Sequence, residues 1–323
     1  MNTNSLPKNY STIYKIGRFL KGKKNNSNNS EEIVLVSSLK KIEIENIDSC
    51  NDTKIQKLFL ELKPFKKYIN VYIHGSWADN TKNTFSDIDD FIIIDIESLE
   101  RENYLSKVCK IINRIDMKFC RIDPIQHHGH WICSKNDLKN YNNSFIPLHI
   151  LNEAKVIIGK NKILGLINQE LTQEGLRKNI INTCNGIQLL SKKLFSNSIN
   201  AYELKGLAGS FVIMPAFIMQ LNGHNCSKPE AIKESHTFFS NQALICIEWS
   251  TNNRNNWGLV TSKFQYKLFS KLTYFFFDPH IWRRFSNKFS PKVQESTINK
   301  LSDKVLTPEI VEKFISESLI YAK

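Results

Sequence analysis

Two carboxylates stand two residues apart at the start of an apolar run. Asp87 and Asp89 come just before Phe91 and the three isoleucines that follow it. Because successive side chains of a strand point to opposite faces, we expect both carboxylates on the same face. Carboxylate oxygens held close together suit a hard cation such as Mg2+ or Mn2+. The pair therefore predicts a metal site where a strand begins.

A Gly-Ser dipeptide ends the apolar segment that precedes this pair. Gly75 and Ser76 directly follow Val71–His74, and a polar stretch separates them from the carboxylates. Glycine lets the backbone approach a ligand closely, and a serine hydroxyl with neighbouring N–H groups can hold phosphate oxygens. A phosphate-binding turn together with a metal-binding pair is the outline of a site for phosphoryl or nucleotidyl transfer. The alternative is an ordinary hairpin whose acidic end faces solvent.

The spacing of these residues resembles the motif of the nucleotidyltransferase superfamily, which includes DNA polymerase beta, kanamycin nucleotidyltransferase and the minimal nucleotidyltransferases. Its members share an apolar residue, Gly, then Gly or Ser, a loop of about ten residues, and Asp-apolar-Asp. The matching residues here are Ile73, Gly75, Ser76 and Asp87-Ile88-Asp89. Trp77 departs from the pattern, because an Arg often follows Gly-Ser in the family.

The resemblance implies an α+β fold. A small mixed sheet with flanking helices would form an N-terminal nucleotidyltransferase domain, and an α-helical bundle domain would follow. It also implies a metal-dependent enzyme that moves an NMP group from a nucleoside triphosphate (NTP) to an acceptor hydroxyl and releases pyrophosphate. In such an enzyme Asp87 and Asp89 would be catalytic metal ligands, and Gly75 and Ser76 would bind the nucleotide.

The resemblance also calls for a third acid on a neighbouring strand. We expect a strand over Lys118–Asp123, ending before Pro124, which makes Asp123 the candidate for the third catalytic metal ligand and for a general base. Asp116 is an alternative that we expect in the turn before this strand. A turn-forming role for the Asp-Pro pair is the non-catalytic interpretation.

Three histidines follow closely, at His127, His128 and His130. Such a cluster suggests zinc, yet Asp123 and Cys133 are the only nearby residues that could complete a usual ligand set. Contact with substrate or base at the rim of the site is a second interpretation. Local turn formation and packing is the third, and the sequence leaves all three open.

Apolar spacing predicts the elements that position these residues. We expect a flexible segment over 1–32, a catalytic domain over 33–165 and a helical domain over 166–323. Ile33–Ser38 is an apolar run of either type. The expected strands are Val71–His74, Phe91–Ile96 and an apolar strand ending at Gly159. The expected helices are Asp52–Phe65, Leu99–Ile115, Thr172–Phe195, Glu203–Leu221 with a kink or break at Pro215, and one opening at Lys228-Pro229.

Composition indicates the cellular compartment in which the protein is expected. The chain has 323 residues and seven scattered cysteines without a CxxC pair, which indicates reduced thiols in a cytoplasmic protein. We expect no signal peptide and no membrane span.

The net charge of +13 indicates a polyanionic partner, either RNA or the triphosphate itself, or else a bias toward Lys and Asn codons. The basic stretch 263–304 fits a nucleic-acid surface or a solvated helix face. The acceptor is open among a small molecule, RNA and protein. A catalytically degenerate nucleotidyltransferase fold that binds a nucleotide or a partner is the alternative function.

Overall fold

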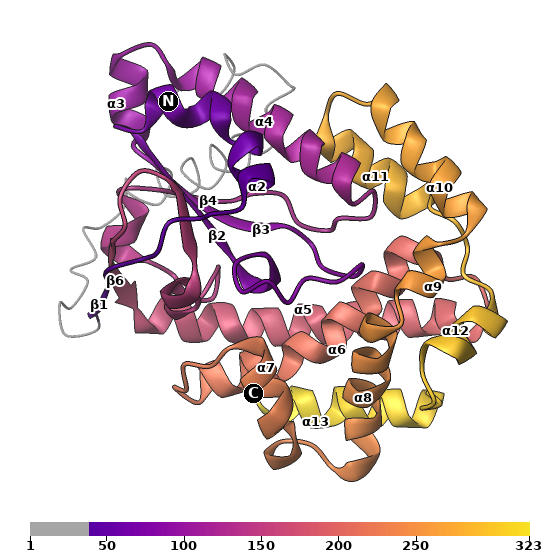
Figure 1. Ribbon diagram of the computed structural model, residues 1–323. Helices are drawn as coiled ribbons and strands as arrows, with labels where there is room; N and C mark the ends of the chain where they lie inside the picture. The colour runs from indigo at the N-terminus through magenta and orange to yellow at the C-terminus, as the bar shows by residue number, and fades with distance from the viewer. Residues whose placement is uncertain (1–38) are drawn as a thin grey trace, which may run out of the picture. The chain divides into compact units, whose positions relative to one another are not determined.

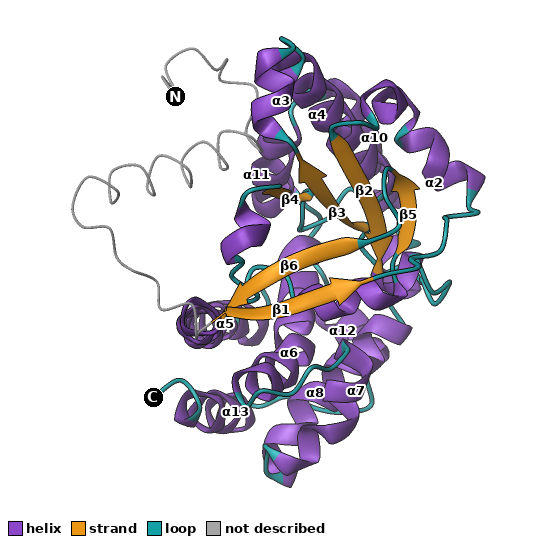
Figure 2. Ribbon diagram, turned by 90° about the vertical axis from the view of Figure 1, so that its left-hand side faces the viewer, coloured by secondary structure: helices purple, strands orange, loops and turns teal. Residues whose placement is uncertain are grey.

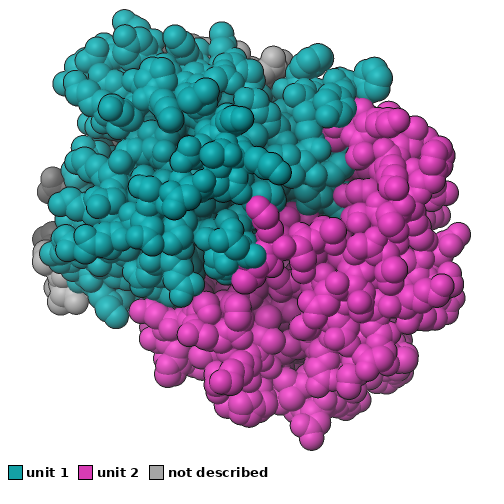
Figure 3. All heavy atoms as spheres, in the orientation of Figure 1, with its two compact units in different colours: residues 1–80, 88–169, 274–282 teal, residues 81–87, 170–273, 283–323 magenta. Residues whose placement is uncertain are grey.

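The computed structural model describes residues 39–323, so the predictions for 1–32 and for Ile33–Ser38 lie outside the described residues. It divides the chain into two compact units, which are coloured separately in Figure 3. Among the described residues, the first unit contains 39–80 together with two later segments, Ile88–Gln169 and Tyr274–Trp282. The second contains Thr81–Asp87, Glu170–Thr273 and Arg283–Lys323.

A four-stranded mixed sheet forms the centre of the first unit (Figure 2). The order is β4-β3-β2-β5, with β3 antiparallel to β2 and parallel to β4. A separate antiparallel pair joins β1 to β6. The strands are β1 Leu39–Ile44, β2 Ile69–His74, β3 Asp89–Ile94, β4 Trp131–Ser134, β5 Lys155–Ile158 and β6 Ile163–Asn168. The predicted small mixed sheet is confirmed, as are the three strands expected at its core.

Alternation along the two central strands creates two separate apolar layers. Ile73 and Ile92 belong to the cluster that includes the helices, whereas Tyr72 and Phe91 belong to the cluster on the other face. All four side chains are fully buried. A strand with both faces covered is largely apolar, which explains the apolar run Phe91–Ile94 within β3.

The helices of the first unit follow their predicted starts more closely than their predicted ends. Asp52 caps the first of them by accepting N–H groups from Lys54 and Ile55, as its side-chain chemistry predicts. The expected helix 99–115 is two helices, separated by Asn103, which has a positive φ. The bounds are α2 Thr53–Leu58, η3 Leu60–Phe65, α3 Ile96–Arg101 and α4 Leu105–Ile122.

The strand predicted over Lys118–Asp123 is wrong, because α4 continues through it to Ile122. Ile115 and Phe119 are four residues apart and both fully buried, so the apolar face of the helix extends across this segment. Asp116 is therefore buried inside α4 and is not in a turn. A six-residue segment with only three apolar residues is too short to separate the period of a strand from that of a helix, and its helical context decides between them.

The second unit is helical (Figure 1). Its core includes Phe211, Trp249 and Phe314, whose rings meet edge to face. The helices are α5 Gln169–Phe195, α6 Ala201–Leu221, α7 Lys228–Lys233, α8 Asn241–Asn255, α9 Gly258–Thr261, α10 Phe264–Lys271, α11 Pro279–Phe289, α12 Glu295–Leu301 and α13 Pro308–Ile320, with 3-10 turns η7 Glu234–Thr237 and η8 Leu272–Phe275. α11 begins in the segment assigned to the first unit.

The predicted ends of α5 and α6 and the predicted start of α7 are confirmed, whereas α5 and α6 begin three and two residues before their predicted starts. Pro215 lies inside α6 without ending it, and Gly223 follows the helix with a φ of +84°. Pro229 occupies the first turn of α7 behind a Ser227 capping box. Within residues 39–323, α6 is the one helix long and apolar enough to cross a membrane, and 56% of its apolar window is buried inside the protein. A core helix of a soluble protein has the same character.

Candidate functional site

The Gly-Ser turn lies directly beside Asp89. β2 ends at His74, and Gly75, with a φ of +64°, opens the one-turn η4 Gly75–Trp77. His74 pairs with Asp89 in the antiparallel register of β2 and β3. A Cβ atom at Gly75 would lie 3.5 Å from Oδ2 of Asp89, which is van der Waals contact. The fold therefore brings together the glycine turn and the second of the two predicted carboxylates.

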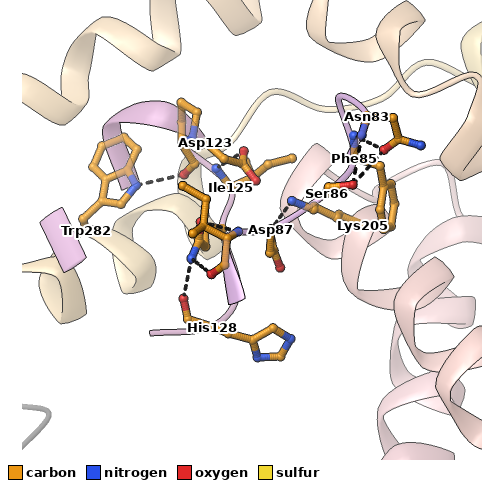
Figure 4. A network of polar contacts seen from close by, with 12 residues as sticks. Asn83, Phe85, Ser86, Asp87, Asp123, Ile125, His128, Lys205 and Trp282 are labelled. Carbon is orange, nitrogen blue, oxygen red and sulfur yellow. Dashed lines mark hydrogen bonds and ion pairs between the residues drawn. The ribbon is translucent and has the colours of Figure 1, made fainter. Parts of the chain in front are cut away.

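Asp87, two residues earlier, is held by the helical unit to which it is assigned. Its carboxylate forms an ion pair with the ammonium group of Lys205 in α6 (Figure 4). Only 2% of the Lys205 side chain and 12% of the Asp87 side chain are exposed. A buried ammonium requires such a partner, because an unpaired charge in a protein interior is strongly disfavoured.

The residues before Asp87 pack onto the same unit. Asn83 Oδ1 accepts the N–H of Phe85 at 2.9 Å and the hydroxyl of Ser86 at 3.2 Å. The Phe85 ring meets Trp257 edge to face, with centroids 5.1 Å apart, and Lys205 Nζ lies 5.5 Å from its centroid. The loop that carries Asp87 is therefore fixed by side chains of the second unit.

Lys205 is a site residue that the sequence motif did not indicate. Lys205 follows Asp87 by 118 residues, a separation that no local motif records. The available signal is a lysine among the apolar residues of a predicted helix, where Leu204, Leu207 and Ala208 are all buried. A lysine in such surroundings needs a buried anion, but the sequence does not say which one.

Asp123 occupies a helix end and not a strand. It is the C-cap of α4, and its Oδ1 accepts the N–H of Ile125 at 3.1 Å. The strands next to β3 are β2 and β4, and neither contains an acidic residue. The expected third acid on a neighbouring strand is therefore absent from the described sheet. In the part of the chain that the structure describes, no group of three or more His, Cys, Asp and Glu side chains could hold a metal ion.

His130 is a buried core residue paired with Asp90. Its Nδ1 lies 2.6 Å from Asp90 Oδ2, and its Nε2 lies 3.0 Å from the carbonyl oxygen of Ile112. Burial lowers the pKa of the ring, whereas the charge and the hydrogen bond of Asp90 raise it. The raising effects outweigh burial, so the net pKa is above its usual value. Packing and charge pairing therefore account for His130.

The other two histidines lie on the approach to β4. The rings of His127 and His128 are 6.4 Å apart, and the His128 ring lies 5.6 Å from that of Trp131. His128 is exposed and His127 half-buried. A zinc cluster does not form among these residues in the described structure, and contact with a ligand stays a prediction.

The fold is α+β, with a small mixed sheet followed by helices. No protein-family model matches the chain, and neither a curated protein nor a solved structure does.

Proposed function

We propose that the protein is a metal-dependent nucleotidyltransferase that moves an NMP group from an NTP to an acceptor hydroxyl and releases pyrophosphate. The observation that carries the proposal is the register that sets Gly75 against Asp89. A glycine in the left-handed region lets a ligand approach the backbone beside a carboxylate. This combination suits a triphosphate whose charge is shared with a cation.

The available carboxylates fit the binding mode of Mg2+ or Mn2+. Proteins commonly hold Mg2+ through one or two carboxylates together with substrate phosphates, so Asp87 and Asp89 supply enough ligands. When bound, the metal would neutralise charge that develops on the transferred phosphoryl group. Ser76, half-buried directly after Gly75, would hold phosphate oxygens.

Asp123 enters this proposal through the family resemblance alone. Its carboxylate accepts a backbone N–H in its own turn, which is a structural task. A role as third metal ligand or general base is therefore weaker than the roles proposed for Asp87 and Asp89.

The acceptor class is also a proposal, open among a small molecule, RNA and protein. An RNA acceptor is supported by the charge of the basic stretch 263–304. Lys267, Lys271 and Lys288 are exposed in this stretch, as are Phe264 and Phe289. Lysines alternating with exposed aromatic rings suit a single-stranded nucleic acid.

The test combines purified protein, each α-labelled NTP, Mg2+ or Mn2+, and a fractionated cell extract. We expect label in one acceptor fraction with the wild-type protein and none with the Asp87→Ala/Asp89→Ala variant. Asp48→Asn is the matched control, because the Asp48 side chain is 76% exposed and its carboxylate forms an ion pair with Lys155. Transfer that persists in the double variant would overturn the proposal.

A second candidate function is a catalytically degenerate binding module. It is favoured by the buried ammonium of Lys205, which already neutralises Asp87, and by the strands beside β3 in the described sheet, which carry no acidic residue. A module of this kind should bind NTP equally well with EDTA and with Mg2+, and should release no pyrophosphate. Calorimetry under both conditions separates it from the enzyme, whose nucleotide affinity should depend on the metal.

A further inference from the structure

We propose that Gln126 is a positioning residue of this site, holding the backbone between the two carboxylates through its side-chain amide. The effect on catalysis rests on the proposed function. The contact between Gln126 and Ile88 does not, because both residues belong to the first unit and the contact is seen in its fold. Gln126 and Ile88 are both 1% exposed, so the contact is screened from water.

The amide of Gln126 binds both polar groups of one backbone residue. Its Oε1 accepts the N–H of Ile88 at 3.3 Å, and its Nε2 donates to the carbonyl oxygen of Ile88 at 3.0 Å. The same Nε2 donates to the carbonyl oxygen of His128 at 3.1 Å. A primary amide presents a donor and an acceptor side by side, so it pairs with Ile88 as a neighbouring strand would.

This contact replaces a missing part of the sheet ladder. On the β4 side, pairing with β3 starts only at Phe91, opposite Trp131. Ile88 lies before that point, yet it is buried, and buried backbone polar groups require partners. Gln126 therefore extends the hydrogen-bonded edge of β3 back to the residue that joins Asp87 to Asp89.

Gln126 is itself fixed by a tight turn after α4, whose residues Asp123 and Ile125 are labelled in Figure 4 together with Trp282. Its N–H donates to the carbonyl oxygen of Asp123 at 3.1 Å. Asp123 Oδ1 accepts the N–H of Ile125, and the indole of the fully buried Trp282 donates to the carbonyl oxygen of Pro124 at 2.8 Å. The Asp-Pro-Ile-Gln turn thus serves to present one amide to Ile88.

This arrangement assigns Asp123 a role that differs from metal binding. An amide oxygen can accept the Ile125 N–H in place of the carboxylate, so Asp123→Asn should preserve the turn and the Gln126 contact. Hydrogen exchange around Ile88 is therefore expected to stay close to the wild-type rate in Asp123→Asn.

The direct test is hydrogen–deuterium exchange of the segment around Ile88 in Gln126→Met, a change of similar length without the amide. Loss of the two buried hydrogen bonds between Gln126 and Ile88 should accelerate exchange of this segment by about tenfold or more. Gln265→Met is the matched control, because Gln265 is exposed on α10. Unchanged protection at Ile88 in Gln126→Met would overturn the proposal, whether or not the wild-type protein transfers nucleotides.

The functional readout is the metal requirement of the same variants. Because small misplacements of reacting groups are costly, Gln126→Met should raise the Mn2+ concentration for half-maximal nucleotide binding and lower kcat, each by about tenfold or more. If Gln126→Met does not fold, Gln126→Glu replaces it. This variant keeps the acceptor for the Ile88 N–H and loses donation to both carbonyl oxygens. A folded variant with an unchanged metal midpoint contradicts positioning, whereas failure of the proposed function is seen in the wild-type protein alone.

Discussion

Asp89 and Asp90 are neighbours on the same strand, yet their surroundings are opposite. Asp89 is half-buried and lies beside the glycine turn, whereas Asp90 is 1% exposed and forms a pair with His130. Alternation along β3 separates the two side chains onto different faces of the sheet. One carboxylate is thereby available to a ligand, and the other is paired with His130 inside the fold.

The contrast shows that residue type alone does not locate a functional acid. Three acidic residues, Asp87, Asp89 and Asp90, lie within four positions of the sequence and are chemically identical. Asp87 binds a lysine, Asp90 binds a histidine, and Asp89 faces the turn. The partner that each side chain finds in the folded chain decides what it can do.

The largest difference between the two faces should be seen in stability. Asp90→Ala leaves the buried His130 without its anion, and breaking a buried ion pair typically costs about 3–5 kcal/mol. We expect a loss of that size in the free energy of unfolding, measured with urea. Asp89→Ala should change it by less than about 1 kcal/mol, since the residue is not part of such a pair. Equal destabilisation by the two changes would remove the distinction.

Activity should show the reverse order. Asp89→Asn should reduce nucleotidyl transfer by about 10²-fold, equivalent to about 2.7 kcal/mol, because an amide binds a cation far less strongly than a carboxylate. The unfolding free energy should be nearly unchanged. Steady-state kinetics with labelled NTP measures the effect, and full activity in the folded variant would refute a ligand role for Asp89.

The Asp90–His130 pair should also make stability depend on pH. Both ring nitrogens face acceptors, so the folded state holds the doubly protonated ring, with Asp90 and Asp116 as the nearby anions. Because the folded pKa of His130 is raised above 6.5, its contribution is full below that pH and is lost as the pH rises through the folded value.

Urea unfolding at a series of pH values above 6.5 measures this dependence. We expect the unfolding free energy to fall with rising pH in the wild-type protein, with a smaller slope in His130→Gln. His236→Gln, in an exposed position, should keep the wild-type slope. An unaltered slope in His130→Gln would assign the pH dependence to other groups.

The smallest effect is expected at Gly75. The change to Ala meets no steric clash, since its Cβ would be 3.5 Å from Asp89, but a φ of +64° costs a non-glycine residue about 1–2 kcal/mol. Gly186→Ala is an informative control, because that glycine lies inside α5 with nothing within 4 Å of its Cβ. It should stabilise the protein by about 0.5–1 kcal/mol. Thermal unfolding compares the two, and a stabilising Gly75→Ala would contradict the strained conformation.

Local patterns predicted most of the fold. β2 and β3 follow from apolar runs, and α5, α6 and α7 follow from helical spacing and caps. The segment 118–123 was predicted as a strand because its three apolar residues fit either period, and only the continuous buried face of α4 decides it.

The site was predictable only where its residues are close in sequence. Gly75 and Asp89 are joined by a short loop and a hairpin register, both of which the motif implies. Lys205 reaches Asp87 across 118 residues, and Gln126 reaches Ile88 across 38. Contacts of this kind depend on how the whole chain folds, and no local period records them.

Because each unit contains a segment from the other half of the chain, the protein cannot be divided into two fragments at a single point without splitting a unit. A fragment ending near residue 169 would retain Thr81–Asp87 without the helices that hold it, and would lack Trp282, whose indole binds Pro124. A fragment starting there would contain the buried Lys205 without its carboxylate. Neither half contains all the segments of its unit, so truncation, domain transplantation and separate expression should all yield unstable products. Recombination between genes would be tolerated only outside residues 81–282, where the two units exchange segments.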